Sequence, residues 1–134
     1  KFGLPIIEVV QGGDAYARVR KLIADSAQTD EEKAARSAAL QEATLYATEV
    51  PLRTMKAASR VFEIVRAMAS EGNPNSVSDA GVGALAARSA VLGACLNVKI
   101  NAAGLKDRAV ADALAAEAVR LEAEVLQIVE SKIG

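Results

Sequence analysis

A run of short polar side chains between Gly72 and Ala84 is the part of this sequence that is best suited to chemistry. The run reads Gly-Asn-Pro-Asn-Ser-Val-Ser-Asp-Ala-Gly-Val-Gly-Ala and contains one carboxylate, that of Asp79. Asn-Pro-Asn predicts a turn, and the apolar residues after it predict a helix. The polar groups would therefore meet free backbone amides at the positive end of a helix dipole, where an anionic or amide-bearing ligand is favoured. A purely structural interpretation is also open, because Ser76 and Asp79 have the spacing of a capping box.

The chemistry open to these residues is limited by the amino acids that the chain lacks. It contains no histidine and a single cysteine, Cys95. Ser-His-Asp and Cys-His nucleophiles and most zinc sites need imidazole, so these kinds of site are excluded. Catalysis would rest on carboxylates, amides, hydroxyls, Lys or Arg, which suit ligand binding and proton transfer. A single cysteine forms no internal disulfide, and Cys95 lies in an apolar stretch, so we expect an inert packing residue and a cytoplasmic protein.

The charge balance points to a compact ligand. The chain has 134 residues, of which 51% are hydrophobic and 25% charged, enough for one domain with a core. Lys and Arg number 16 against 17 Asp and Glu, a net charge of -1. Such a chain has no electrostatic reason to bind nucleic acid or an anionic membrane, so we expect a small-molecule partner instead.

The elements that would position the polar run are helices. Apolar residues recur at spacings of three and four through most of the sequence, which predicts an all-α fold. Residues 1–13 lack this pattern and are an unassigned N-terminal arm, whereas residues 14–134 form a helical domain. A first helix is expected from about residue 14 to residue 26, with Asp14 as its cap.

The second helix has a clear start signal. Thr29 and Glu32 have the spacing of a capping box, and the helix should reach about Val50. Pro51 lacks an amide hydrogen and crowds the preceding turn. It should either kink one continuous helix or separate the second helix from a third over residues 52–71.

Two further helices should follow the polar run. Gly72 is the expected stop of the third helix, and the fourth should cover about residues 77–103. Gly104 would end that helix, and a fifth would cover about residues 107–133.

The fourth helix has an unusual composition. Between residues 80 and 100 its only charges are Arg88 and Lys99, and small side chains are spread over several of its faces. A helix that is apolar nearly all round is normally buried, so this should be the central helix. The two charges interrupt the run of ~20 apolar residues that a membrane span would need. We therefore expect an antiparallel bundle of about five helices with a buried central helix, covered in part by a second subunit in a homodimer or larger assembly.

Several stretches of this sequence resemble the cyclodeaminase/cyclohydrolase family of folate enzymes. The similar segments are, in order of weight, Gly72–Val82, Leu96–Asn101, Gly104–Asp107, Glu49–Leu52, Thr29–Lys33 and Asp14–Tyr16. The family includes the C-terminal domain of formiminotransferase-cyclodeaminase and the stand-alone methenyltetrahydrofolate cyclohydrolases. Its members usually begin with a Pro-Thr-Pro-Gly-Gly-Gly type loop that contributes to the folate site, and residues 1–13 do not contain that loop.

The resemblance implies a dimer-forming helical fold that needs no metal and holds no permanent cofactor. Its implied substrate is a tetrahydrofolate derivative, and the function that it first suggests is that of a formimidoyltetrahydrofolate cyclodeaminase. That reaction converts 5-formiminotetrahydrofolate into 5,10-methenyltetrahydrofolate and ammonia. A methenyltetrahydrofolate cyclohydrolase is the alternative within the family, and a non-catalytic folate-binding or structural module is a further one. Fusion or association with a formiminotransferase would also agree with the family.

The resemblance also implies roles for individual residues. Asp79 is the first choice for the carboxylate that moves a proton or stabilises a cation, and Asp14 would be a second. The residues expected to bind the pterin, the amide linkage or the glutamate tail of folate are Asn73, Asn75, Ser76, Ser78, Tyr16, Asn97, Asn101 and Arg53.

Each of these residues also has a structural interpretation. Asp79 and Asp14 could serve only as helix caps, and the polar groups around Pro74 could satisfy only the backbone of their own turn. Asn97 and Asn101 are four residues apart, and a buried amide could instead join two helices. Arg53 could simply be solvated.

Overall fold

The computed structural model describes Ala17, Lys21 and residues 29–132. Within residues 29–132 the chain forms helices and turns, without a strand. The elements are α2 (Asp30–Ser59), α3 (Val61–Glu71), the short 3₁₀-helix η1 (Pro74–Ser76), α4 (Val77–Ala102) and α5 (Arg108–Lys132). The all-α prediction is confirmed for this part of the chain.

Some predictions fall outside the described residues. These are the arm over residues 1–13, most of the helix expected over residues 14–26, and the two candidate site residues Asp14 and Tyr16. The count of about five helices and the homodimer therefore stay predictions.

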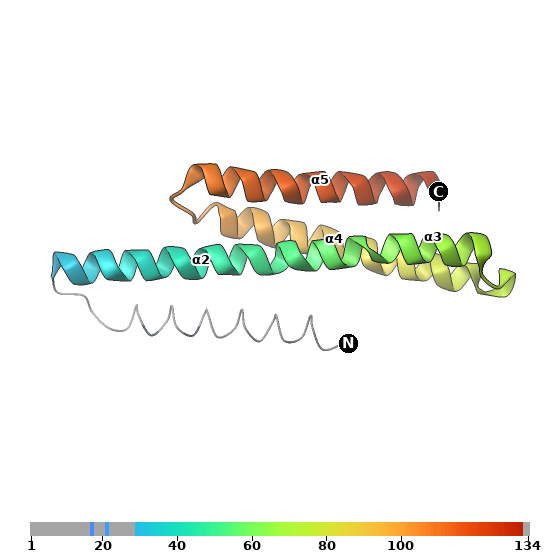
Figure 1. Cartoon of the computed structure of the whole chain (residues 1–134), viewed down its shortest axis with the longest axis horizontal. Coiled ribbons are helices and arrows are strands. Elements are labelled where there is room, and N and C mark those ends of the chain that lie inside the picture. The colour runs from blue at the N-terminus through green and yellow to red at the C-terminus, as the bar shows by residue number, and fades with distance from the viewer. Residues whose placement is uncertain (1–16, 18–20, 22–28, 133–134) are drawn as a thin grey trace.

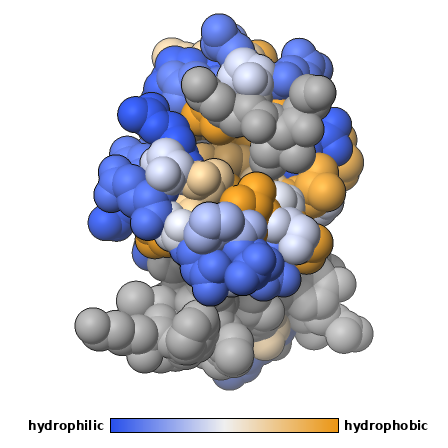
Figure 2. Space-filling model, turned by 90° about the vertical axis from the view of Figure 1, so that its right-hand side faces the viewer, coloured by the Kyte–Doolittle hydropathy of each residue, from blue (hydrophilic) through white to orange (hydrophobic). Residues whose placement is uncertain are grey.

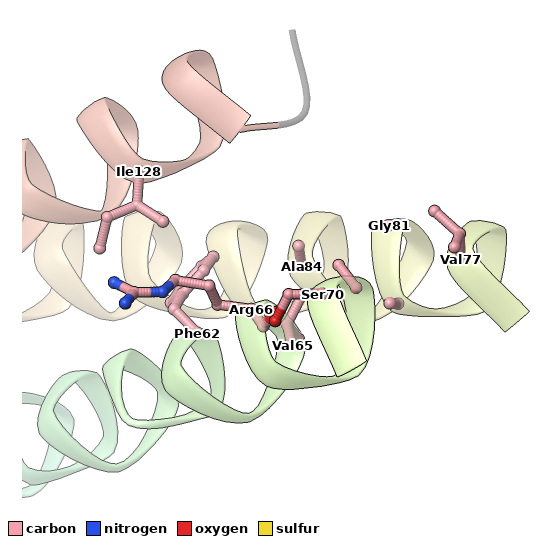
Figure 3. A pocket seen from close by; sticks show the side chains of 10 residues that line it. Phe62, Val65, Arg66, Ser70, Val77, Gly81, Ala84 and Ile128 are labelled. Carbon is pink, nitrogen blue, oxygen red and sulfur yellow. The ribbon is translucent and has the colours of Figure 1, made fainter. Parts of the chain in front are cut away.

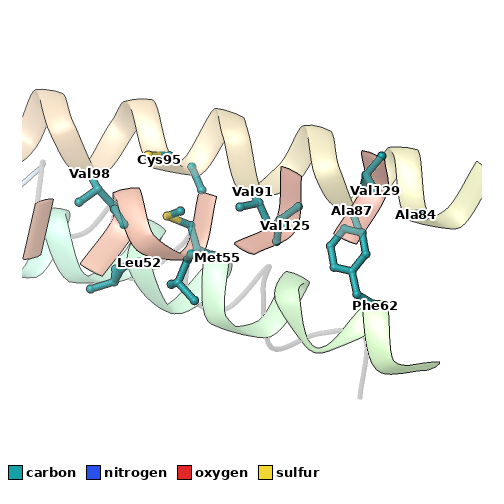
Figure 4. Packing of buried hydrophobic residues seen from close by; sticks show 13 residues of the cluster. Leu52, Met55, Phe62, Ala84, Ala87, Val91, Cys95, Val98, Val125 and Val129 are labelled. Atoms are coloured by element: carbon teal, nitrogen blue, oxygen red, sulfur yellow. The ribbon is translucent and has the colours of Figure 1, made fainter. Parts of the chain in front are cut away.

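The helices pack as an antiparallel arrangement around α4. In Figure 1, α2 and α3 run along the molecule, α4 returns beside them, and α5 runs back again. Helix α4 contacts α2, α3 and α5, which confirms its central position. The main core lies where α4 meets its neighbours and contains Met55, Phe62, Val91, Val98 and Val125, all shown in Figure 4.

Helix α2 begins as its capping signal predicts. The amide of Glu32 donates to Thr29 Oγ1 at 3.1 Å, and the amide of Thr29 donates to Glu32 Oε2 at 3.3 Å. Both halves of the capping box are therefore present, and they satisfy two amides that the first turn leaves without helical partners.

Pro51 lies inside α2 and does not end it. Because proline has no amide hydrogen, the carbonyl of Ala47, four residues earlier, loses its helical donor. The side chain of Asn101 on α4 replaces that donor, since its Nδ2 lies 2.8 Å from the Ala47 oxygen. The helix is continuous through the proline because a neighbouring helix satisfies the carbonyl that proline leaves free.

The break between the second and third helices falls later than the sequence suggested. A helix over residues 52–71 was expected, but α2 continues to Ser59 and the interruption is at Arg60. Helix α3 then ends before Gly72, as predicted, although Gly72 has a φ of -80° rather than a positive value. Its need for glycine is steric, because a Cβ atom there would lie 2.3 Å from the Met68 carbonyl oxygen.

The first half of α2 is joined to the turn between α4 and α5 by a polar side chain. Gln41 on α2 donates through Nε2 to the Gly104 oxygen at 3.2 Å and accepts at Oε1 from the Lys106 amide at 2.7 Å. One side chain thus fastens α2 to the turn between α4 and α5.

Burial of α4 differs from the expectation of a helix covered all round. Ala84, Val91 and Val98 are fully buried against the other helices. The opposite side, which we call the outer face, carries exposed residues spaced three or four apart: Asp79, Val82, Ala86, Ala90, Gly93, Asn97 and Ile100. Val82 is 66% exposed and Ile100 is 70% exposed, so the described part of the chain leaves one apolar side of α4 uncovered.

Length and composition alone would allow one helix to cross a membrane. It covers Pro74–Ala102, and only 33% of its most apolar window is buried. The core helix of a water-soluble protein passes the same test, and α4 packs against three other helices, so this signal is weak.

Candidate functional site

The turn between α3 and α4 is stabilised by its own asparagine. Asn73 Oδ1 accepts from the Asn75 amide at 3.0 Å, and the Asn73 carbonyl accepts from the Ser76 amide at 2.8 Å. Ser76 makes no side-chain capping bond at the start of α4. The capping box suggested by the spacing of Ser76 and Asp79 is therefore wrong, since Asn73 organises the turn instead.

Asp79 is consequently not used as a cap. It lies in the first turn of α4, and its side chain is exposed, as are those of Ser78 and Asn75. No hydrogen bond or ion pair joins its carboxylate to any other residue in the part of the chain that the structure describes. A carboxylate on the first turn of a helix, with its oxygens open to solvent, is available to a ligand.

Asn97 and Asn101, two candidate residues further along α4, do not lie close to Asp79 within one chain. Asn97 shares the outer face with Asp79 but is 18 residues along the helix, which corresponds to about 27 Å. Asn101 is turned towards α2, where its Nδ2 donates a hydrogen bond to the Ala47 carbonyl oxygen. This agrees with the interpretation that its amide joins two helices. Within one chain, these residues do not gather around one pteridine ring.

Arg53 also stands apart from the polar turn. It is exposed on α2, with its guanidinium 5.7 Å from the centre of the Tyr46 ring, the geometry of a cation–π contact. Its predicted role at the glutamate tail of folate stays a prediction.

Cys95 sits in a small polar cluster at the contact of α4 with α5. Its buried Sγ lies 3.5 Å from Glu122 Oε2, and Lys99 Nζ lies 3.1 Å from the same oxygen. Burial raises the pKa of the Cys95 thiol, and the hydrogen bond to Glu122 raises the pKa of Lys99. The thiol is therefore protonated at neutral pH, which suits a packing residue better than a nucleophile.

A hollow lies beside the polar turn. It lies between α3, the first half of α4 and the end of α5, with a volume of about 560 Å³, and we call it the α3–α5 groove. Figure 3 shows Phe62, Val65 and Arg66 on its α3 side, Gly81 and Ala84 on its α4 side, and Ile128 on its α5 side. Figure 2 faces the end of the molecule at which the groove lies, where apolar side chains appear between polar rims.

The groove and Asp79 occupy different sides of α4. Gly81 lines the groove, and Asp79, two residues earlier, is rotated by about 200° around the helix axis. The expectation that the carboxylate would face the hollow is therefore not met within one chain. Sequence reasoning also missed Phe62 and Arg66, although Phe62, Val65 and Ala69 have the three- and four-residue spacing that marks one face of a helix.

Comparison with known proteins identifies relatives of this sequence. The sequence model described as formiminotransferase-cyclodeaminase matches residues 11–120, most of the chain. The chain belongs to the formiminotransferase-cyclodeaminase family. The polar turn and α4 both fall inside the matched residues, and the family resemblance drawn from the motifs is confirmed.

Three members of the formiminotransferase-cyclodeaminase family show what share of a relative's length this chain covers. It is 44% identical over 113 residues to methenyltetrahydrofolate cyclohydrolase from Methylorubrum extorquens, covering 79% of this chain and 54% of that protein. It is 34% identical over 93 residues to formimidoyltransferase-cyclodeaminase from Mus musculus, covering 69% of this chain and 17% of that protein. The Sus scrofa protein of the same name is 36% identical over 96 residues, covering 72% of this chain and 17% of that protein. The chain thus spans about half the length of the bacterial relative and less of the mammalian ones.

Proposed function

We propose that this member of the family acts on a tetrahydrofolate derivative as a methenyltetrahydrofolate cyclohydrolase. The observation that carries the proposal is the 44% identity to the bacterial protein of that name. The cyclodeaminase reading, which the motifs first suggested, becomes the second candidate, because the mammalian proteins of that name are 34–37% identical over shorter stretches.

The proposed reaction needs a group that handles a proton beside a cationic carbon. Water adds to the methenyl carbon and loses a proton, and one carbon–nitrogen bond then breaks. The freed nitrogen takes up a proton, and a formyl group stays on the other nitrogen. We assign the proton transfer from water to Asp79, whose open carboxylate would also stabilise the positive charge of the bound methenyl ring. Asn75, Ser76 and Ser78 would hold the pterin, and a contribution from Asp14 and Tyr16 belongs to the same proposal.

A spectroscopic assay tests this function. Hydrolysis of 5,10-methenyltetrahydrofolate removes its absorbance, so the chain should speed the decay above the rate in buffer. Asp79→Asn should lower kcat by about a hundredfold or more, the usual range for a proton-transfer group. Asp112→Asn, at an exposed aspartate paired with Arg108 on α5, should leave the rate unchanged.

The same preparation separates the alternatives. Ammonia release from 5-formiminotetrahydrofolate, without faster decay of the methenyl compound, would replace the cyclohydrolase with the cyclodeaminase. Calorimetric binding of a reduced folate that persists in Asp79→Asn, without turnover of either compound, would indicate a folate-binding module. Absence of both turnover and binding would reject a folate function for this chain.

We further propose that the protein is a homodimer built on the outer face of α4. Residues on this face are arranged symmetrically: Asp79 and Asn97 are equally far from position 88, as are Ala86 and Ala90. A two-fold axis there would bring Ala86 beside Ala90 of the second copy, where small side chains let helices approach closely. It would also place the carboxylate of Asp79 next to the amide of Asn97 from the second copy, a complementary acceptor and donor.

The remaining parts of the proposal follow from the chemistry and the family. Proton transfer and charge stabilisation by a carboxylate need no metal or bound cofactor, so none is assigned. The reaction is placed in the cytoplasm, as the single cysteine suggested. Association with a formiminotransferase is an expectation prompted by the names of the mammalian relatives.

A further inference from the structure

The α3–α5 groove has the size and lining of a small-molecule site. Its volume of about 560 Å³ lies within the range of ligand pockets, and its walls are mainly apolar. The space exists because α4 presents Ala80, Gly81 and Ala84 where α3 and α5 lie apart. A Cβ atom on Gly81 would meet no atom within 4 Å, so this glycine leaves room that a ligand can fill.

The groove carries one charge. Arg66 is the only charged residue among the described residues that line it, and the guanidinium makes no ion pair or hydrogen bond with another described residue. In Figure 3 it extends into the space between α3 and Ile128 of α5. An unpaired guanidinium over an apolar wall suits a planar carboxylate, which it can bind through two parallel hydrogen bonds.

An adjoining hollow adds an unsatisfied polar group. This second space, of about 460 Å³, shares Phe62, Arg66 and Ile128 with the groove. Ser59 also lines it, and the buried Ser59 Oγ has no hydrogen-bond partner among the described residues. A buried hydroxyl normally has a partner, so Ser59 offers a ligand a second polar contact.

From these observations we propose that the α3–α5 groove binds a flat aromatic ring that bears a carboxylate, either directly on the ring or on a short side chain. Its ring would lie against Phe62, Ala84 and Ile128, and its carboxylate would pair with Arg66. The shared chemistry is a flat ring with a carboxylate, carried either by the benzoyl-glutamate end of the folate substrate or by a separate organic acid. The first source rests on the proposed function, whereas the second does not.

Titration of the full chain with 2-naphthoate, followed by amide chemical shifts, tests the site without any turnover. The shifts should centre on Phe62, Arg66, Gly81 and Ile128. Gly81→Leu fills the groove and should abolish binding. Ala113→Leu, at an exposed residue of α5 that lines neither hollow, is the matched control, and it should leave the Kd unchanged.

Charge is tested separately from shape. Arg66→Gln should raise the Kd for 2-naphthoate about tenfold or more, the loss expected for a charged hydrogen bond. The neutral 2-naphthamide should bind the unsubstituted chain correspondingly less tightly. Binding to Gly81→Leu at full strength, or equal binding of the acid and the amide, would overturn the proposal.

Kinetics then distinguish the two sources of the carboxylate. If the acid is the tail of the substrate, Arg66→Gln raises the KM for methenyltetrahydrofolate and leaves kcat unchanged. If the KM also stays unchanged while 2-naphthoate binding is lost, the groove takes a separate acid. Absence of any turnover would reject the proposed function but not the groove, which the titration tests by itself.

Discussion

At the scale of single residues, the contact of Asn101 with Ala47 shows how one side chain compensates for another. Pro51 removes a backbone donor from the middle of α2, and the amide of Asn101 on α4 supplies the missing hydrogen at 2.8 Å. The sequence made Asn101 a candidate ligand-binding residue and, equally, a candidate for joining two helices. The structure shows the second of these contacts, and the choice was not open to sequence reasoning because the two partners are 54 positions apart.

We predict that Asn101→Ala lowers the free energy of unfolding by about 1–3 kcal/mol, because it leaves the Ala47 carbonyl without a donor. In the background of Pro51→Ala, which restores a backbone amide one turn after Ala47, the same substitution should cost less. Urea denaturation of the four proteins gives the coupling energy. Equal losses in both backgrounds would show that Asn101 acts independently of the proline.

At the scale of the elements, the turn between α3 and α4 requires a residue without a Cβ atom at position 72. Gly72 ends α3 with a negative φ, so its conformation is open to any residue. What excludes a larger residue is the Met68 carbonyl oxygen, which would lie 2.3 Å from an added Cβ atom. The turn that carries Asn73 and leads to Asp79 is thus positioned by a close backbone approach.

Gly72→Ala should therefore lower the free energy of unfolding by about 1–3 kcal/mol, since backbone atoms must shift to admit the methyl group. Gly81→Ala, where the added methyl group meets open space, should instead raise that free energy by up to ~1 kcal/mol through helix propensity. Thermal and urea unfolding of both variants measure the contrast. A Gly72→Ala protein as stable as its parent would mean that the end of α3 relaxes without cost.

The sequence predicts the elements better than their contacts. The Thr29 capping box, the start of α4 near Val77 and the end of α3 at Gly72 were each set by local signals, and all three are present. The break at Arg60 was missed, because proline is the stronger local signal and its cost was removed by a distant residue. The α3–α5 groove was missed because it arises where three helices diverge, which local periodicity does not encode.

At the scale of the whole molecule, the outer face of α4 is an apolar surface that the described part of the chain leaves exposed. Val82 and Ile100 on this face, and Leu85 and Leu96 at its edges, are between 49% and 70% exposed, an unusual number of large apolar side chains for one side of a helix. The apolar composition of α4, which predicted burial, is explained if a second copy covers this side. The two-fold arrangement about position 88 would then complete each Asp79 site with Asn97 of the second copy.

Replacing an alanine at the centre of this face by a charged residue tests the proposed dimer. Ala86→Arg should convert a dimer into a monomer in sedimentation equilibrium, because two arginines would meet near the two-fold axis. Ile64→Arg, at a residue 61% exposed on α3, should leave the dimer intact. A monomeric unsubstituted chain at about 100 µM, well above the dissociation constants of stable dimers, would reject the dimer.

The Gln41 contact has a consequence for the order in which the molecule assembles. The α3–α4 hairpin closes over a few residues at Gly72, whereas Gln41 reaches Gly104 and Lys106 across 63 and 65 positions. Closing a longer loop costs more chain entropy, so non-local contacts form late. We therefore expect the two local hairpins, α3–α4 at Gly72 and α4–α5 between Ala102 and Arg108, to form before Gln41 joins α2 to the turn that carries Gly104 and Lys106.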